Sequence, residues 1–423
     1  MMGARTCAVE KRAELDALVP TDHLLRRVDR ALDLAGVRAE LAACYSRIGR
    51  PSVDPEMLLR LLLVGYLYGI TSERRLVEEM RVNVAYRWFA GLPFGERVPH
   101  HSTFSKNRHG RFGAGVFRAV FEAVVRRCIA AGLVAGDACS VDGSMVDADA
   151  SPQRHREPTA SEDFGAGPYP PAAPPAKVSP TDPESAWASK GGIARFAYYT
   201  NYLVDNRRGV IVDVEATPAR YSAEAAAARV MVLRTRATLG LAVTALGADR
   251  GYGNGPFFAW CVEHGVTAYA PVLDRTHQGN APYGQFTIHD FAYDAAADAY
   301  VCPAGARLRC VASTPTTQVY QYRAPASACR ACALKPRCTR GQQRQLSVSW
   351  HDAARRAAAA LAGTRAYLDA GRARRTVEAR FAELKRYVGL RRLRLRGLPR
   401  AAEQFLLAAT AQNLKRLAVA QPP

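Results

Sequence analysis

Three acidic residues that are far apart in the sequence occupy local settings suited to a catalytic metal site. Asp142 lies within an apolar run, Asp249 ends another apolar run before a glycine-rich turn, and Glu378 lies in a helical stretch. Mg²⁺ prefers carboxylate oxygens, and two divalent ions about 3.5–4 Å apart can bind the attacking and leaving oxygens of an in-line displacement. Asp142, Asp249 and Glu378 are therefore predicted to be catalytic and to ligate Mg²⁺ or Mn²⁺ in an enzyme that cuts phosphodiesters.

The position of each aspartate on its strand decides which acids can meet. Alternate residues of a strand face opposite sides, so Asp142 shares a face with Ser144, whereas Asp147 falls on the opposite face. Asp142 is therefore preferred over Asp147 and Asp149 as the first acid. Asp249 lies at the C-terminal end of its predicted strand, which is where ligands gather in open sheets with helical crossovers.

Glu378 is expected to lie between two cations on the last long helix. Arg374, Glu378 and Lys385 fall on one helical face. The adjacent apolar stripe consists of Val377, Phe381, Leu384 and Val388. The helix can thus pack on a sheet and present Glu378 at its edge, with cations placed to contact a phosphate backbone.

The charge of the chain favours a nucleic-acid partner. Its 423 residues include 58 Lys+Arg against 38 Asp+Glu, for a formal charge of +20, and 48% are hydrophobic, which predicts folded domains. The alternative is charge that serves solubility alone. Basic residues are dense from 372 to 400 and predict salt-dependent DNA binding. The residues assigned to DNA contact are Arg374, Lys385, Arg386, Arg391, Arg392 and Arg394.

Three of the ten cysteines are grouped as zinc ligands often are. Cys329 and Cys332 form a Cys-x-x-Cys pair, Cys338 follows, and Cys302 is the best fourth ligand, with Cys310 as its rival. Four thiolates leave no open position, so such a Zn²⁺ site is predicted to be structural. The N-terminus lacks an apolar signal region and no stretch is long enough to span a membrane, so we expect a cytoplasmic, nucleoid-associated protein with reduced thiols.

The periodicity of apolar residues divides the chain into four parts. Residues 1–135 are predicted to be helical, with caps at Asp54, Thr71 or Ser72, and Ser102. That part is expected either to bind DNA ends or to serve in packing or dimerisation. Residues 136–273 are predicted to begin a mixed α/β core, 274–365 to form an insertion that contains the cysteine cluster, and 366–423 to complete the core with helices.

The core is expected to contain strands, helices and one loose loop. Strands are predicted at 140–146, 196–204, 210–216, 242–248 and 266–272, and helices at 221–239 and 257–263. That order is the order of a ribonuclease H-like fold, a mixed sheet flanked by helices. Residues 151–190 are rich in Pro, Ala and Ser and are predicted to form a flexible loop.

An ordered set of short motifs runs over nearly the whole chain. The motifs are Asp22-His-Leu-Leu-Arg, Gly49-Arg-Pro-Ser-Val-Asp-Pro, Gly65-Tyr-Leu-Tyr-Gly, Tyr86-Arg-Trp-Phe, His101-Ser-Thr-Phe-Ser-Lys-Asn-Arg, Val141-Asp-Gly-Ser, Ala248-Asp-Arg-Gly-Tyr-Gly, Arg375-Thr-Val-Glu-Ala-Arg-Phe, Gly389-Leu-Arg-Arg-Leu and Gln412-Asn-Leu-Lys-Arg-Leu.

This ordered set resembles the DDE-type insertion-sequence transposases of the IS1182 group. The resemblance implies a DNA transposase that cuts double-stranded DNA at element ends and transfers a freed 3′-hydroxyl to target DNA, as a homo-oligomer on DNA. It maps the acidic triad onto Asp142, Asp249 and Glu378. Of the family's Tyr, Arg, Glu, Lys pattern, Arg374, Glu378 and Lys385 are present, and Gly371 stands at the tyrosine position. Two alternatives remain, namely an endonuclease on the same core without strand transfer, and a catalytically silent DNA-binding protein derived from a transposase.

Overall fold

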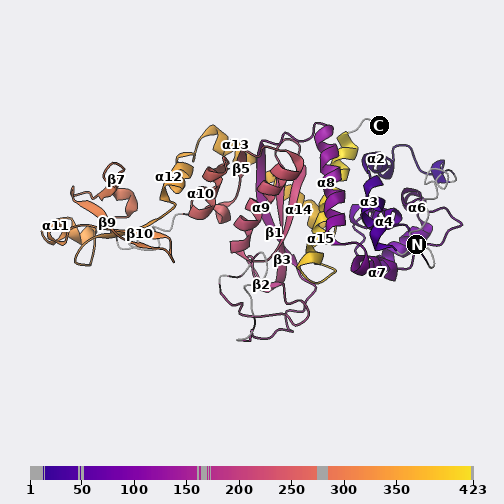
Figure 1. Cartoon of the computed structure of the whole chain (residues 1–423), viewed down its shortest axis with the longest axis horizontal. Helices are drawn as coiled ribbons and strands as arrows, with labels where there is room; N and C mark the ends of the chain where they lie inside the picture. Colours follow the sequence, from indigo (N-terminus) through magenta and orange to yellow (C-terminus); the bar gives the residue numbers. More distant parts are fainter. Residues whose placement is uncertain are drawn as a thin grey trace. The chain divides into compact units, whose positions relative to one another are not determined.

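The computed structural model describes residues 13, 15–45, 48, 52–159, 162, 169, 171, 173–273 and 284–420. The chain divides into two compact units, of which the first comprises 1–247 and 369–423 and the second comprises 248–368. Each unit contains helices and a sheet (Figure 1), so the fold is mixed α/β. Residues 248–273, which the sequence assigned to the core, pack with the second unit. None of the described helices combines the length and the apolar character that a membrane crossing needs.

The N-terminal part of the first unit is helical, as its apolar spacing predicts. Asp54 caps one helix by accepting a hydrogen bond from the Glu56 backbone N–H at 2.8 Å, and Ser72 caps the next, so both predicted caps are confirmed. Ser102 is instead the first helical residue, and His101 takes the capping position. The helices are α2 (Leu24–Ala31), α3 (Ala35–Leu41), α4 (Pro55–Leu67), α5 (Glu73–Val82), α6 (Val84–Ala90), α7 (Ser102–Gly110) and α8 (Ala114–Ala130), with the 3₁₀ turn η1 (Ala42–Cys44) after α3.

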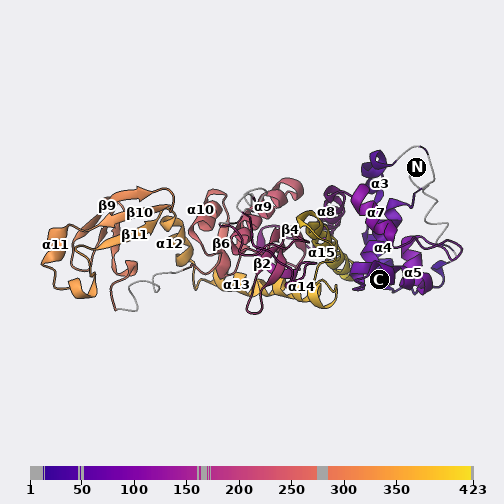
Figure 2. The same ribbon diagram turned by 90° about the horizontal axis from the view of Figure 1, so that it is seen from below.

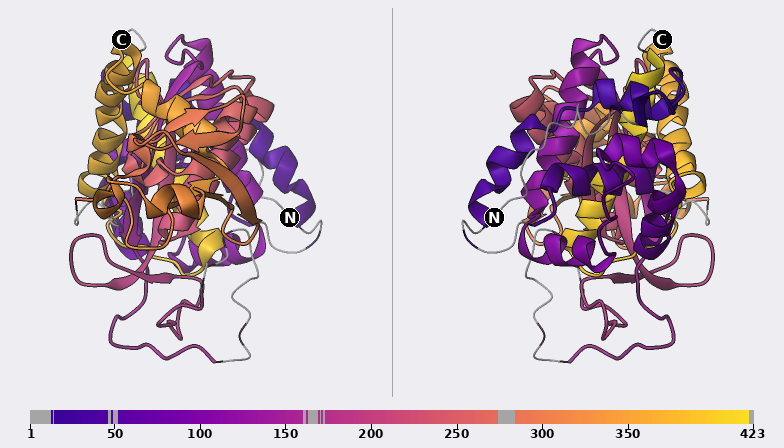
Figure 3. Two further views of the ribbon diagram at one scale, coloured as in Figure 1. Left: turned by 90° about the vertical axis from the view of Figure 1, so that its left-hand side faces the viewer. Right: turned by 90° about the vertical axis from the view of Figure 1, so that its right-hand side faces the viewer.

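The C-terminal helix α15 (Leu398–Ala420) joins these helices to the sheet. It packs against α2, α4 and α8, and also against strand β4 (Ile211–Pro218). In Figure 3 this yellow helix runs among the indigo and purple N-terminal helices. Arg108 of α7 is buried and forms ion pairs with Glu73 of α5 and Glu403 of α15. A buried charge needs such partners, so the pairs tie α7 to both neighbours.

The sheet of the first unit is built on two long strands, β1 (Ala138–Asp147) and β3 (Arg195–Asp205). β3 pairs antiparallel with β1, with β4 and with the short β2 (Ala186–Ala188), and β5 (Ala245–Gly247) pairs parallel with β1. The strands predicted at 140–146, 196–204 and 210–216 are confirmed and extend further. β5 is shorter than the predicted 242–248, because Val243 has a positive φ of 41°, which interrupts the extended backbone.

Helices cover both faces of this sheet. α9 (Tyr221–Leu239) packs against β1, β3 and β4, and α14 (Arg375–Arg386) packs against β1 and β3. Figure 2 shows α9 and α14 on opposite sides of the strands. A Cβ at Gly143 would come within 2.5 Å of the Glu224 carboxylate on α9, so Gly143 faces α9 at very close range. Its neighbour Asp142 therefore faces the α14 side.

Part of the predicted flexible loop is firmly packed. In the described residues 173–190, Val178, Ser179, Asp182 and Ser185 are buried. Asp182 accepts hydrogen bonds from the Tyr198 hydroxyl at 2.6 Å and from the Gly397 backbone N–H at 3.1 Å, and burial raises the pKa of its carboxyl. The flexible-loop prediction is therefore wrong for 173–190, because polar side chains there hydrogen-bond to the folded unit, and composition alone does not show such contacts.

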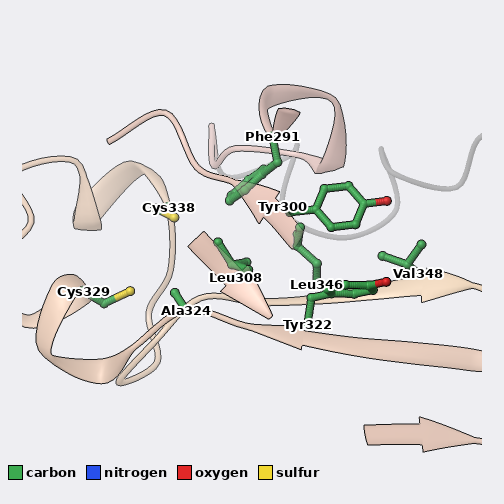
Figure 4. Packing of buried hydrophobic residues seen from close by; sticks show 9 residues of the cluster. All are labelled: Phe291, Tyr300, Leu308, Tyr322, Ala324, Cys329, Cys338, Leu346 and Val348. Atoms are coloured by element: carbon green, nitrogen blue, oxygen red, sulfur yellow. The ribbon is translucent and has the colours of Figure 1, made fainter. Parts of the chain in front are cut away.

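The second unit contains an antiparallel sheet with the order β11-β10-β9-β8-β7. Its small core includes Phe291, Tyr300, Leu308, Tyr322 and Leu346 (Figure 4). The strands of this sheet are β7 (Ala292–Asp294), β8 (Ala299–Val301), β9 (Arg307–Thr314), β10 (Val319–Arg323) and β11 (Gln345–Ser349), whereas β6 (Thr267–Tyr269) does not belong to it. The helical elements are η2 (Arg250–Tyr252), α10 (Gly255–Glu263), η5 (Ile288–Asp290), α11 (Ala326–Arg330), η6 (Lys335–Arg337) and α12 (Asp352–Ala360), while α13 (Arg365–Ala373) leads back to the first unit.

Candidate active site

Asp142 lies in the middle of β1 and is half-buried. Its Oδ1 accepts a hydrogen bond from the Gly143 backbone N–H at 2.8 Å. Its antiparallel partner on β3 is Tyr202. Residues that are directly opposite each other in an antiparallel pair carry their side chains on the same face, so Asp142 and Tyr202 share one face of the sheet.

The Tyr202 ring links that face to the helix that carries Glu378. Tyr202 stacks on Phe381 of α14, with 4.9 Å between ring centroids and 24° between ring planes. Glu378 precedes Phe381 by three residues, so the two lie about one helical turn apart. The stack therefore places the Glu378 turn of α14 on the Asp142 face of the sheet.

Glu378 is exposed and has a cation beside it. Its side chain is 55% exposed, and its Oε1 lies 3.1 Å from the Arg374 guanidinium, one turn earlier. This ion pair confirms the predicted face shared by the two residues. The Glu378 carboxylate is thus open to solvent, while the adjoining helix surface is fixed against the sheet.

Two buried amides hold α14 and β4 in place from α15. Gln412 donates a hydrogen bond to the Arg380 carbonyl at 2.9 Å, which fixes the helix that carries Glu378. The Asn413 side chain accepts from the Ile211 backbone N–H at 3.0 Å and donates to the Ile211 carbonyl at 2.8 Å, which fixes the start of β4. The predicted apolar stripe of Val377, Phe381, Leu384 and Val388 is buried. The Gln412-Asn413 motif therefore serves the architecture around the site.

Asp249 belongs to the second unit and begins the turn η2. It is half-buried, and its Oδ1 accepts a hydrogen bond from the Gly251 backbone N–H at 2.7 Å. A Cβ at Gly253 would lie 1.9 Å from the Pro271 carbonyl oxygen, so this turn requires glycine there. The glycine-rich motif that follows Asp249 is thus explained by a close approach of backbone to backbone.

The first unit brings Asp142 near the helix turn of Glu378, and the second unit carries Asp249. Within the described parts of the chain, no three acidic, histidine or cysteine side chains are already arranged around a common metal position. The donor types nevertheless fit Mg²⁺, a hard cation that takes carboxylate oxygens and retains water ligands. Asp147 lies on the opposite face and pairs with Arg195 at 3.0 Å, so it does not compete with Asp142.

Basic side chains gather beside β1. Lys190 follows β2 and donates a hydrogen bond to the Gly143 carbonyl at 3.4 Å, next to Asp142. The pKa of Lys385 on α14 is lowered, first by burial and then by the charges of Lys190 and Arg391. Like charges that crowd together in this way favour an anion between them. Sequence reasoning missed Lys190, because only the packing of 173–190 brings it to β1.

The remaining predicted DNA contacts differ in exposure. Arg386 and Arg391 are exposed, and Arg392 is exposed while lying 3.5 Å from Asp149. Arg394 instead lies over the buried Tyr66 ring, 5.0 Å from its centroid. That contact links the C-terminal segment to α4, so we assign Arg394 to packing and leave it out of the proposed DNA surface.

The clustered cysteines of the second unit line one cavity of about 440 Å³. Cys329 and Cys338 are buried, and Cys302 and Cys332 are half-buried. Burial raises the pKa of the Cys338 thiol, which Arg344 lowers and the other three thiols raise further. The cysteines in the lining of this cavity are Cys302, Cys329, Cys332 and Cys338.

Two regions of the chain match family models. Residues 13–110 match a model described as Transposase domain (DUF772), and residues 301–418 match a model described as Transposase DDE domain. Glu378 lies inside the second region, whereas Asp142 and Asp249 lie outside both. No curated protein matches the chain.

Proposed function

Because the chain belongs to the IS1182-like DDE transposases, whose two typical regions it carries, we propose that it cuts phosphodiester bonds at the ends of an insertion element and joins the freed 3′-hydroxyl ends to target DNA. We propose Asp142, Asp249 and Glu378 as the ligands of two Mg²⁺ or Mn²⁺ ions. When bound, such ions stabilise the attacking and leaving oxygens of an in-line displacement. The stack of Tyr202 on Phe381 is the observation that carries the proposal, because it places the Glu378 turn on the Asp142 face.

The register of the parallel strands supports the place of Asp249. β1 and β5 pair in register up to Ser140 and Gly247. Asp249 follows the end of β5 by two residues and caps the turn η2. Ligands gather where the parallel strands of a sheet end, so we propose that the Asp249 carboxylate completes the metal site.

A ribonuclease H-like core is the fold that we propose for this site. The order of elements supports that assignment: the antiparallel strands β1, β3 and β4 are followed by helix α9 and then by the parallel strand β5. In such a core the first acid would lie on β1, the second would follow β5, and the third would lie on a later helix. Glu378 on α14 has that place.

Arg374 forms a weak ion pair with the Glu378 carboxylate. Exposed pairs four residues apart on a helix contribute only about 0.3–0.5 kcal/mol. The Glu378 carboxylate could therefore exchange the guanidinium for a divalent ion at little cost, which would leave Arg374 to contact a phosphate.

DNA backbone contacts are proposed for the exposed and crowded cations around β1 and α14. A positively charged surface releases counterions when it neutralises phosphates, so binding should weaken steeply with salt. We also propose that copies of the chain assemble on paired element ends, since both ends must be cut and joined. The proposed contacts are Lys190, Arg374, Lys385, Arg386, Arg391 and Arg392.

The test is a reaction of the purified chain with labelled candidate ends and a target plasmid, in Mg²⁺ or Mn²⁺. Joined products support the transposase. Cut ends without joined products would instead establish an endonuclease, and bound but uncut DNA would establish a silent DNA-binding protein.

A further inference from the structure

We propose that Cys302, Cys329, Cys332 and Cys338 bind one structural Zn²⁺ ion in the second unit. All four side chains line the same cavity, although they come from separate segments, one after β8 and one from α11 to η6. In the described structure, the four sulfurs are not already grouped around one position, so zinc binding would draw them together. None of the four is in a disulfide. Four sulfur donors suit Zn²⁺, and a complete set leaves no position for a substrate.

The backbone around Cys302 is shaped as a tight turn around its sulfur. The Gly305 N–H donates to the Cys302 carbonyl at 2.8 Å, and the Ala306 N–H donates to the Cys302 Sγ at 3.2 Å. Gly305 has a φ of +79°, a conformation in which a side chain would be strained. N–H donors aimed at a sulfur stabilise the thiolate form that binds a metal.

In the segment that contains Cys329, a backbone N–H also lies at a cysteine sulfur. The Arg344 backbone N–H lies 3.5 Å from the Cys329 Sγ. Cys329 and Cys332 are separated by two residues, and the Cys332 N–H donates to the Cys329 carbonyl at 3.4 Å. The Arg344 side chain donates to the Cys338 carbonyl at 2.8 Å, which fixes the third cysteine of this segment. Backbone on each side of the cavity is thus set to hold sulfur ligands.

The fold also decides between Cys302 and Cys310 as the fourth ligand. Cys310 is exposed on β9, and its thiol donates to the Ala312 carbonyl at 3.6 Å. It does not line the cavity, whereas Cys302 does. Cys310 is therefore outside the ligand set and provides a matched control.

A metal would supply what the small core lacks. The core cluster that contains Cys329 and Cys338 consists of nine buried residues, two of them these cysteines. Domains with so few apolar side chains usually need a disulfide or a metal. A zinc ion would link the turn that contains Cys302 to the segment from Cys329 to Cys338.

The experiment measures zinc in the full-length chain, purified from zinc-supplemented cells under reducing conditions and dialysed. Elemental analysis should find one equivalent of zinc in the wild type and in Cys310→Ser, and loss of zinc in Cys302→Ser and Cys332→Ser. If a ligand variant does not fold, cobalt substitution of the wild type decides, because four thiolates give strong thiolate-to-cobalt charge-transfer bands and tetrahedral visible bands. Any of three results would overturn the site. The wild type could bind neither zinc nor cobalt, or it could contain a disulfide between Cys329 and Cys332 in place of the metal. Zinc could also be lost from Cys310→Ser but kept by Cys302→Ser.

Discussion

Tyr202 and Phe381 stack with 4.9 Å between their ring centroids, and through this contact the strand partner of Asp142 holds the helix of Glu378. Both rings are buried, so neither can move without opening a space in the core. The separation between the Asp142 carboxylate on β1 and the Glu378 carboxylate on α14 thus depends on two uncharged aromatic rings.

Loss of the Phe381 ring should disturb catalysis more than it disturbs the fold. Phe381→Leu keeps an apolar side chain but loses the stack, so we expect DNA cleavage to fall while DNA affinity is retained. Phe381→Ala should in addition lower the free energy of unfolding by about 3–5 kcal/mol, the usual cost of such a cavity. Phe121→Leu in the buried face of α8 is the control for core repacking. Equal cleavage by the two leucine variants at equal folded fraction would refute a positioning role for the stack.

Lys190 should contribute to DNA binding through a phosphate. Lys190→Ala should weaken binding to all sequences alike and lower the slope of log Kobs against log[salt] by about 0.9, the value for one lost phosphate contact. Lys177 in the same segment lies over the Trp187 ring at 4.7 Å, so Lys177→Ala is the matched control and should leave the slope unchanged. Titrations by fluorescence anisotropy at several salt concentrations measure both, and identical slopes for wild type and Lys190→Ala would contradict the contact.

Asn413 should be important for stability. Its side chain satisfies both backbone groups of Ile211, so Asn413→Ala leaves a buried N–H and a buried C=O without their partner. Such a loss costs about 1–3 kcal/mol per unsatisfied group. Thr410 on the same helix bonds only to the Leu406 carbonyl of its own helix, so Thr410→Ala should cost less. Urea unfolding compares the two variants, and an equal or smaller loss for Asn413→Ala would show that α15 does not hold β4 by this amide.

Removal of zinc should unfold the cysteine-containing part of the second unit. Structural zinc sites contribute about 10–16 kcal/mol of apparent binding free energy to folding. A zinc-selective chelator, used with Mg²⁺ in excess, should make the segment 284–349 sensitive to limited proteolysis, and added zinc should restore its resistance. Fragment masses identify the cut sites. Proteolysis that is unchanged by the chelator would mean that the segment folds without metal.

The pattern of apolar residues predicted the elements of the first unit well, because its long strands and helices are rich in buried apolar residues. β1, β3 and α9 appear where alternation and helical spacing place them, and the shared face of Arg374 and Glu378 follows from helical geometry. The short β5 could not be predicted, since the left-handed φ of Val243 depends on contacts with a distant segment.

The site was only partly predictable for the same reason. The acids lie in recognisable local patterns, but the place of Lys190 beside Gly143 depends on residues 47 positions apart in the sequence. Composition predicted a flexible loop where Asp182 is buried and hydrogen-bonded to Tyr198. Long-range polar contacts of this kind leave no periodic signal.

The most direct measurement of the central claim is metal-dependent nicking of labelled end DNA by a set of five proteins, namely the wild type, Asp142→Asn, Asp249→Asn, Glu378→Gln and Asp147→Asn. The three proposed ligand variants should bind DNA, but their nicking rate should fall at least about a hundredfold. Even the mutation of a residue that only supports a metal ligand lowers metal affinity or activity about 10–100-fold. Asp147→Asn, on the opposite face of β1, should cleave like the wild type. Cleavage by Asp142→Asn, Asp249→Asn or Glu378→Gln at the wild-type rate would contradict a shared pair of cations at these three carboxylates.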